Sequence, residues 1–398
     1  MLETIDQVNW EALNDAYGPS AGTPRRIFAL ASPNQHERDQ ALRDLCATIY
    51  HQGTIYAASV AAVPFLLELA ALAELADRAP TLQVLRALST GTSFHEAHAS
   101  LIFNREKSQT AEWQEQVRTE KAWVAAIHEQ LAAAVPGLAV VLSEGRPAER
   151  LAAASLLGTL QDQPAAVAAL ARAATDSDPV LSATALTVLG GGDKPPVALF
   201  EQCFAGATSE LARCVAAIQL LLHCLAKSPA AVEYLLDQLR TPRPDLREAY
   251  GALADAGEFL GDLGQALAAA PPAAGAAAFP LLYEQVKHSR YPLSPSETFG
   301  VLVLATMLRP PPEGKWSAAA LTHEQRLAIR LVADRAWTID RGVPTTHGNL
   351  TDLLEQAGLP RKREEIFTLL AGSPEGVQTP REEKAWSSRK RRPSWKFW

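Results

Sequence analysis

The feature that constrains the fold most is a short frame of residues that recurs every 31 to 34 positions. In this frame an arginine or serine is followed by alanine three residues later and by leucine seven residues later. Spacings of three and seven place the three positions on one face of a helix. A period of this length holds two short helices and a turn, so it predicts a stack of helix pairs, an α-solenoid. The successive anchors are Arg150, Ser182, Arg213 and Arg247, and Arg38 anchors an earlier frame.

The frame loosens toward the C-terminus, where the anchor Arg247 is followed by Tyr250 and Ala254. Clusters of β-branched residues are short and lie in alanine-rich, helix-favouring context, so the fold class that we predict is all-α. We expect a solenoid over residues 1–254, a less regular helical continuation over residues 255–371, and a disordered tail over residues 372–398.

The frame, a polar turn followed by an arginine and then by alanine and leucine at helical spacing, resembles HEAT repeats. The stretches VNWEALNDAYG and ALASPNQHERDQALRDLCATIYHQGTIYAASVAAVPFLLEL also resemble the start of a group of bacterial HEAT-repeat domain proteins. The resemblance covers roughly Val8 to Ala254, and Asp255 to Leu370 only loosely. It implies a curved helical array that binds another macromolecule, and no settled activity comes with it.

Several helix boundaries are suggested by proline and glycine. Pro64, Pro136 and Pro280 each stand at the start of an apolar run, in AAVPFLLEL, AAVPGLAVVL and AAFPLLYEQV. Because proline has no N–H to donate and fits the first turn of a helix, we expect all three to begin helices. We likewise expect Gly53 to end one helix and Thr54 to cap the next.

Composition bounds the cellular setting. The chain has 398 residues, 47% of them hydrophobic, with no basic, apolar leader pattern at its start and no uninterrupted apolar run of the roughly 18 residues that a membrane span needs. Ala132–Leu142 is too short and contains Pro136 and Gly137. The chain contains no C-x-x-C pair, so neither a disulfide framework nor a zinc site is indicated. We therefore expect a cytoplasmic protein with reduced cysteines, at positions Cys46, Cys203, Cys214 and Cys224.

Three short motifs are candidates for chemical sites. In SFHEAHASL, His95 and His98 share a helix face with Glu96 between them, but the zincin spacing H-E-x-x-H is not met, and a metal site is the weaker alternative. HQGTIY, residues 51–56, is interpreted as a helix end in preference to a polar pocket. Gly190–Gly192 is interpreted as a helix stop and linker because it lacks the ending of a phosphate loop. We expect no catalytic residue, cofactor or bound metal.

Residues 90–121 interrupt the alanine-rich rhythm with long polar side chains. This segment predicts an extended helix or an inserted loop. Insertions in repeat arrays often lie on the binding face, and a solvated connector is the open alternative.

The tail, residues 372–398, carries seven basic and three acidic residues, a net charge of +4 on a chain of net charge −7, which leaves about −11 on the remainder. Its aromatic residues alternate with the basic ones. Such a segment can bind an acidic protein surface, an anionic lipid surface or single-stranded nucleic acid, and we favour an acidic protein surface, own or foreign. The predicted partner-binding residues are Lys384, Trp386, Arg389, Lys390, Arg391, Arg392, Trp395, Lys396, Phe397 and Trp398.

These features predict a non-enzymatic scaffold or adaptor that binds a protein partner, of which an inhibitor or immunity-type role would be one form. The alternative is a HEAT-like nucleic-acid-binding protein or DNA glycosylase, and the acidic body opposes it because phosphates are negatively charged. A lyase role like that of phycobilin-lyase-type HEAT proteins is weaker still. Peripheral membrane contact through the tail stays open, and the oligomeric state is not predicted.

Overall fold

The structure is a computed structural model that describes residues 2–99, 104–207, 209–224, 228–289, 292–307, 316–340, 343–345 and 348–372. Within these residues there are nineteen α-helices, and the strands form only three two-stranded antiparallel ribbons. The all-α prediction is confirmed. The chain divides into two compact units, unit 1 (Met1–Leu282) and unit 2 (Tyr283–Trp398).

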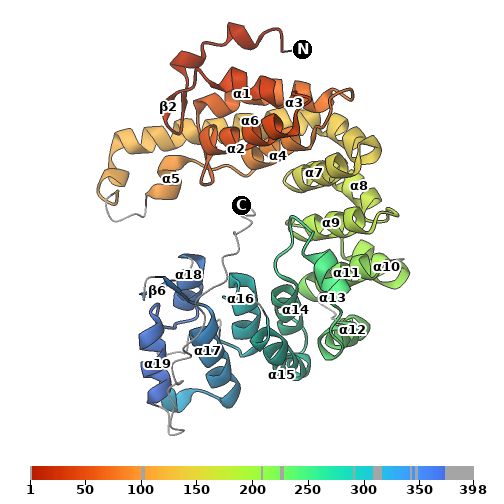
Figure 1. Cartoon of the computed structure of the whole chain (residues 1–398), viewed down its shortest axis with the longest axis vertical. Coiled ribbons are helices and arrows are strands. Elements are labelled where there is room, and N and C mark those ends of the chain that lie inside the picture. Colours follow the sequence, from red (N-terminus) through yellow and green to blue (C-terminus); the bar gives the residue numbers. More distant parts are fainter. Residues whose placement is uncertain are drawn as a thin grey trace. The chain divides into compact units, whose positions relative to one another are not determined.

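Unit 1 begins with short elements and continues through successive helices (Figure 1). Its short elements are the 3₁₀ turns Ile5–Gln7, Trp10–Ala12 and Lys107–Gln109 and the strands β1 (Asn14–Asp15), β2 (Gly18–Pro19), β3 (Tyr50–His51) and β4 (Thr54–Ile55). Its helices are α1 (Thr23–Ala29), α2 (Gln35–Thr48), α3 (Ala57–Ala71), α4 (Ala79–Ser89), α5 (Phe94–His98), α6 (Ala111–Glu144), α7 (Pro147–Gly158), α8 (Pro164–Ala173), α9 (Pro179–Gly190), α10 (Val197–Gly206), α11 (Glu210–His223), α12 (Pro229–Arg240), α13 (Pro244–Tyr250) and α14 (Phe259–Ala268).

Helix α15 (Pro272–Lys287) crosses from unit 1 into unit 2. Unit 2 continues with α16 (Pro295–Leu304), a 3₁₀ turn (Ala318–Ala320), α17 (His323–Arg335), β5 (Thr338–Asp340), β6 (Val343–Thr345), α18 (Gly348–Gln356) and α19 (Arg363–Ala371). Within this unit α17 packs against α16 and α19, and α18 packs against α16.

In unit 1 the helices α4, α7, α9, α11 and α14 pack against one another in series. Helix α7 contacts α4 and α9, α9 contacts α11, and α11 contacts α14. The intervening helices α8, α10 and α12 pack against their sequence neighbours. Close approach is possible because small residues lie between the helices: a methyl group added to Gly158 of α7 would lie 2.6 Å from Cβ of Val188 in α9.

The anchors of the sequence frame occupy one position in their helices. Each is the fourth residue of its helix, and the alanine three positions later is buried wherever the frame has one, which confirms the predicted frame. The anchors are Arg38 in α2, Arg150 in α7, Ser182 in α9, Arg213 in α11 and Arg247 in α13, and the buried alanines are Ala41, Ala153, Ala185 and Ala216.

Four of the five anchor side chains donate to backbone carbonyls at the end of the preceding helix or in the turn that follows it. Arg150 Nε donates to the carbonyl of Leu142 at 2.9 Å, Ser182 Oγ to Ala174 at 2.6 Å, and Arg213 Nη2 to Ala207 at 3.5 Å. Arg38 makes the same contact with the carbonyls of Ser32 and Pro33. The last carbonyls of a helix have no partner inside the helix, so this contact satisfies a group that the turn would otherwise leave bare.

The same contact occurs in unit 2, outside the five predicted frames. Arg326 is the fourth residue of α17, and its Nη2 donates to the carbonyl of Ala318 at 3.2 Å.

The predicted helix starts at the three prolines are wrong. Pro64 lies inside α3, Pro136 inside α6 and Pro280 inside α15. All three are exposed. On the solvent side of a curved helix the carbonyl that loses its N–H partner can bond to water, which explains why the helices continue.

The prediction for Gly53 is also wrong. Helix α2 ends at Thr48, and Gln52 and Gly53, with φ of 49° and 90°, form the turn of the β3–β4 hairpin. Two consecutive positive φ values are what a tight hairpin turn needs, and glycine supplies one of them without strain. The helix stop predicted at Gly190–Gly192 is confirmed, since α9 ends at Gly190.

Residues 90–121 form α5, a 3₁₀ turn and the first part of α6, and residues 100–103 of this segment lie outside the described part. Among the described residues, α6 is one helix long and apolar enough to cross a membrane by length and composition alone. It continues through Pro136 and Gly137, which we expected to interrupt the apolar run. It packs against α3, α7 and α8 of unit 1.

Candidate functional site

Two of the motifs considered from the sequence lie beside each other in unit 1. The N–H of Thr92 donates to the carbonyl of Gly53 at 2.9 Å, and the N–H of Ile55 donates to the carbonyl of Thr92 at 3.2 Å. The segment HQGTIY, which forms the β3–β4 hairpin, therefore lies against the start of SFHEAH. Sequence spacing could not have revealed this, because about forty residues separate the two motifs.

A buried carboxylate from α6 binds the start of SFHEAH. Glu120 is 5% exposed and accepts three hydrogen bonds: from Ser93 Oγ at 2.6 Å, from the N–H of His95 at 2.9 Å, and from His95 Nδ1 at 2.7 Å. A carboxylate with several donors holds an imidazole in a fixed orientation. The pair ties the first turn of α5 to α6.

The neighbouring polar residues of SFHEAH have other partners. Lys121 pairs with Glu96 at 2.7 Å, and Nδ1 of His98 lies 2.8 Å from the carbonyl of Phe94. The side chains of His95, Glu96 and His98 thus go to three different partners. Within the described residues, no group of three His, Cys, Asp or Glu side chains is placed to hold a metal ion.

Ser93 has two structural contacts. Its Oγ accepts from the N–H of Glu96 at 3.1 Å as the cap of α5, and it donates to Glu120. A nucleophilic serine would instead have its hydroxyl directed at a base and open to substrate. The arrangement of Ser93, His95 and Glu120 is accordingly one that stabilises a helix start.

A shallow cavity of about 650 Å³ lies next to this cluster, between the start of α5 and the middle of α6. Three of the side chains that line it are in ion pairs: Lys121 with Glu96, and His128 Nε2 with Asp162 Oδ2 at 2.9 Å. The hydrogen bond from His128 lowers the pKa of Asp162. Side chains that are already in ion pairs are less available to bind a charged ligand.

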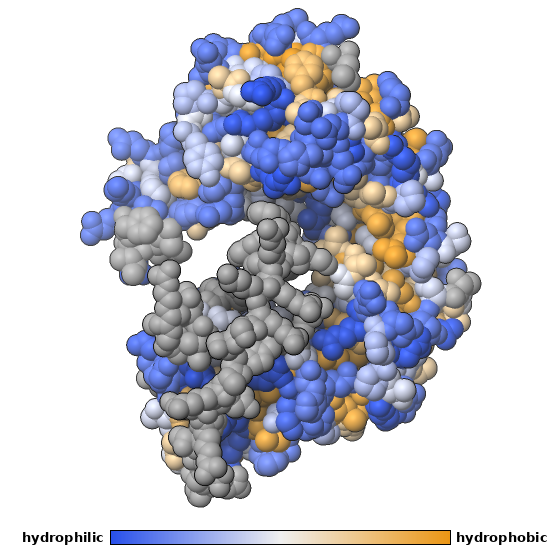
Figure 2. All heavy atoms as spheres, in the orientation of Figure 1, coloured by the Kyte–Doolittle hydropathy of each residue, from blue (hydrophilic) through white to orange (hydrophobic). Residues whose placement is uncertain are grey.

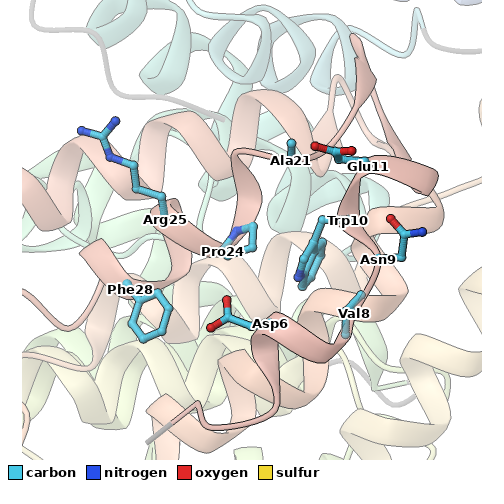
Figure 3. Close-up of a pocket in the computed structure, with 9 residues that line it drawn as sticks. All are labelled: Asp6, Val8, Asn9, Trp10, Glu11, Ala21, Pro24, Arg25 and Phe28. Atoms are coloured by element: carbon cyan, nitrogen blue, oxygen red, sulfur yellow. The ribbon is translucent and has the colours of Figure 1, made fainter.

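A second surface feature is the groove at the N-terminus of unit 1, about 660 Å³ in volume (Figure 3). Trp10, Pro24 and Asp6 lie at its centre, with Phe28 and Arg25 on one side and Val8, Asn9, Glu11 and Ala21 around the remainder. Hydrophobic residues also reach the surface above the N-terminal helices (Figure 2).

The groove is held in shape by Trp10. Its Nε1 donates to the carbonyl of Ile5 at 2.8 Å, Ser20 Oγ donates to its carbonyl, and its ring lies 6.1 Å from the ring of Phe65 in α3. Phe28 stands on the rim with 42% of its surface exposed, which is unusual for a large aromatic residue. No sequence pattern marked Phe28, because only the fold places it beside the Trp10 segment.

The predicted partner-binding residues of the tail, Lys384–Trp398, lie outside the described residues. Glu120 was missed although it falls inside the segment 90–121, because one glutamate among many long polar residues carries no sequence signal for burial.

The comparisons with protein-family models and with curated proteins give no match. Among solved structures, the chain is similar to one described as a crystal structure of an engineered protein, with 16% sequence identity and a TM-score of 0.28. The alignment covers 89% of this chain and 95% of that chain. At this TM-score the likeness supports no argument about fold or function.

Proposed function

We propose that this chain is a HEAT-like α-solenoid that serves as a scaffold for a protein partner. The recurring backward contact supports the repeat identity: in α2, α7, α9, α11 and α17 the fourth residue donates to a carbonyl before its own helix. The packing of α7 on α9 and of α9 on α11 supports stacking of successive helix pairs. Stacked helix pairs present extended surfaces, which repeat proteins use for binding.

The observation that carries partner binding is the N-terminal groove. It combines an apolar floor, an exposed aromatic residue, Phe28, and an arginine, Arg25, which are the residue types enriched where protein interfaces hold most of their binding energy. Its charged rim also contains Asp6 and Glu11.

The charge of this region indicates the kind of partner. Residues 2–15 contain Glu3, Asp6, Glu11 and Asp15 and no lysine or arginine, and α1 adds Arg25 and Arg26, so the region is acidic overall. A partner segment with basic and aromatic side chains would complement this charge, whereas the phosphates of a nucleic acid would be repelled. The groove is therefore proposed to take a basic segment of a protein.

The test begins with a photo-crosslinking amino acid in place of Phe28, expressed in the native host, to capture the partner that touches the groove. The captured protein is then purified, and its affinity is measured for the wild type, for Phe28→Ala and for Tyr17→Ala. Tyr17 is the matched control, since it is an exposed aromatic residue that does not line the groove.

We expect Phe28→Ala to weaken binding by about tenfold or more, because an aromatic residue that a partner buries typically contributes over 1 kcal/mol. Tyr17→Ala should leave the affinity unchanged. Equal affinity of all three proteins would contradict the assignment of the groove. Cross-links to DNA or RNA, with affinity that falls steeply with salt, would favour the nucleic-acid alternative.

A further inference from the structure

The loop between α13 and α14, residues 251–258, makes a contact far from its own helices, and we call it the strap. Asp255 in the strap accepts hydrogen bonds from Arg86 Nη2 in α4 and from Ser155 Oγ in α7. These residues precede Asp255 by 169 and 100 positions. The Asp255 side chain is only 10% exposed.

The strap thus passes from one part of the helix stack to another within unit 1. At its base α13 and α14 pack against α11, while its carboxylate reaches α4 and α7, which pack against each other. In Figure 1 the chain between α13 and α14 runs beside α9 and α11. Leu253 is buried and fixes the start of the strap.

The strap covers a position of the repeat frame that is exposed in α2 and half-buried at Thr187 of α9. In the repeat frame, the residue five positions after the anchor is Arg43 in α2 and Ser155 in α7. Arg43 is exposed, but Ser155 is buried and bonded to Asp255. The position that is exposed in α2 is therefore covered in α7, as it also is at Ile218 of α11.

The closure is weakly held. The strap contains no helix or strand, and the side chain of Arg86 is 41% exposed, so water screens the ion pair. Beyond buried Leu253, the contact of the strap with α4 and α7 rests on the single carboxylate of Asp255, so the strap should open more readily than the helices beneath it.

The donors under the strap define what could replace it. A guanidinium and a hydroxyl that both point at one carboxylate form a site for an acidic side chain. We infer that Arg86 and Ser155 form a binding site for an acidic side chain of a protein partner. Asp255 occupies this site as an internal competitor until the partner displaces the strap. The partner in this inference rests on the proposed scaffold function, whereas the opening of the strap does not.

The opening is tested on the full chain by thiol labelling of Ser155→Cys, followed by mass spectrometry of the peptide that contains residue 155. Adding Asp255→Ala should raise the labelling rate about tenfold or more, because the cover is released. Asp245→Ala is the matched control: it removes an exposed carboxylate of α13 that pairs with Arg243, and it should leave the rate unchanged.

A second reporter separates strap opening from unfolding. Ala153→Cys places a thiol in the core of α7, where the residue is fully buried, and its labelling should stay slow with or without Asp255. If Asp255→Ala leaves Cys labelling at position 155 unchanged, or accelerates positions 153 and 155 alike, the strap is not a separable cover and the inference fails.

The preference of the site for an acidic side chain is tested with a glutamate-rich peptide and a glutamine-rich peptide of equal length. The acidic peptide should increase hydrogen exchange of residues 251–258 in the wild type and should have no effect in Arg86→Ala, while the neutral peptide should have none in either protein. An equal effect of both peptides, or no effect of the acidic one, overturns the assignment of an acidic occupant. Neither experiment involves the N-terminal groove, so failure here is distinguishable from failure of the proposed function.

Discussion

Arg78 and Glu149 are 71 positions apart in sequence, and Nη2 of the arginine donates to Oε2 of the glutamate at 2.8 Å. The N–H of Arg78 also donates to Oε1 of the same carboxylate at 3.1 Å. Arg78 is the cap of α4 and Glu149 lies in the first turn of α7, so the pair fastens the starts of two packed helices. Arg146 adds a further ion pair at the edge of the cluster.

Replacing Glu149 with glutamine should lower the free energy of unfolding at neutral pH by about 3–5 kcal/mol, because it leaves the buried charge of Arg78 without a counter-charge. Glu149 is only 1% exposed, so water cannot substitute. Urea unfolding of the two proteins measures the difference. Asp245→Asn, which breaks an exposed pair, should keep the wild-type midpoint, and an unchanged midpoint for Glu149→Gln would contradict the assigned role.

The same carboxylate should make stability depend on pH in the acid range. Burial raises the pKa of Glu149, but the hydrogen bonds from Arg78 and Arg146 outweigh this and hold the pKa at about 2, below the ordinary 4.5. A lowered pKa stabilises the folded state above the unfolded-state value, and this contribution is lost as the pH falls toward 2. Between about pH 5 and pH 2 the wild type should lose stability more steeply than Glu149→Gln. Parallel curves in urea unfolding would show that the shift is absent.

Pro64→Ala should stabilise the protein, because Pro64 interrupts the hydrogen bonding of a continuous α3. The gain should be about 1–3 kcal/mol, reduced by the greater freedom that alanine gives the unfolded chain. Thermal unfolding measures it. Pro147→Ala is the control, since Pro147 is the first residue of α7 and blocks no bond within the helix. Stabilisation by both substitutions to the same extent would argue against the interior position of Pro64.

Gly158→Ala and Gly137→Ala should have opposite effects although both glycines lie in helices. A methyl group at Gly158 would press on Cβ of Val188, which cannot turn aside, so this substitution should destabilise by about 1–3 kcal/mol. Nothing lies within 4 Å of the corresponding atom at Gly137, and alanine there should stabilise α6 by up to about 1 kcal/mol. Chemical denaturation of both variants checks the pair, and the same sign for both would refute the close packing of α7 and α9.

For the tail we expect contact with an acidic protein surface, because its charge is +4 and that of the remainder is about −11. If that surface is the protein's own, removing the residues after Gly372 should lower the melting temperature. Neither form should bind anionic vesicles or single-stranded DNA. Salt-sensitive binding by the intact chain that disappears on truncation would instead assign the tail to lipid or nucleic acid.

The repeat frame could be predicted because its signal is local. The three frame positions lie on one helix face. The spacing of Arg150, Ala153 and Leu157 therefore predicts a helix without any tertiary information. The backward bond of Arg150 to Leu142 also spans only eight residues.

Other features depended on the surroundings that the fold creates. Proline favours a helix start on average, but Pro64 is tolerated inside α3 because its ring faces solvent, and exposure is a property of the packed molecule. The sequence at Gln52 and Gly53 fits a helix end and a hairpin turn equally well. The pairing of β3 with β4 decides for the hairpin turn. The hydrogen bonds that Glu120 accepts come from residues up to 27 positions away, a distance at which sequence spacing carries no information.

The backward bond of the frame has a consequence for how such a chain can change in length. Residues 147–178 carry a helix pair, the donor Arg150 and the carbonyl of Ala174 that the next donor, Ser182, uses. Duplication or loss of one such block leaves every donor with an acceptor, because the block begins and ends at equivalent points. Gain or loss of half a block would leave an anchor guanidinium without the carbonyl to which it donates. A chain built on this frame is therefore expected to gain or lose length in whole helix pairs.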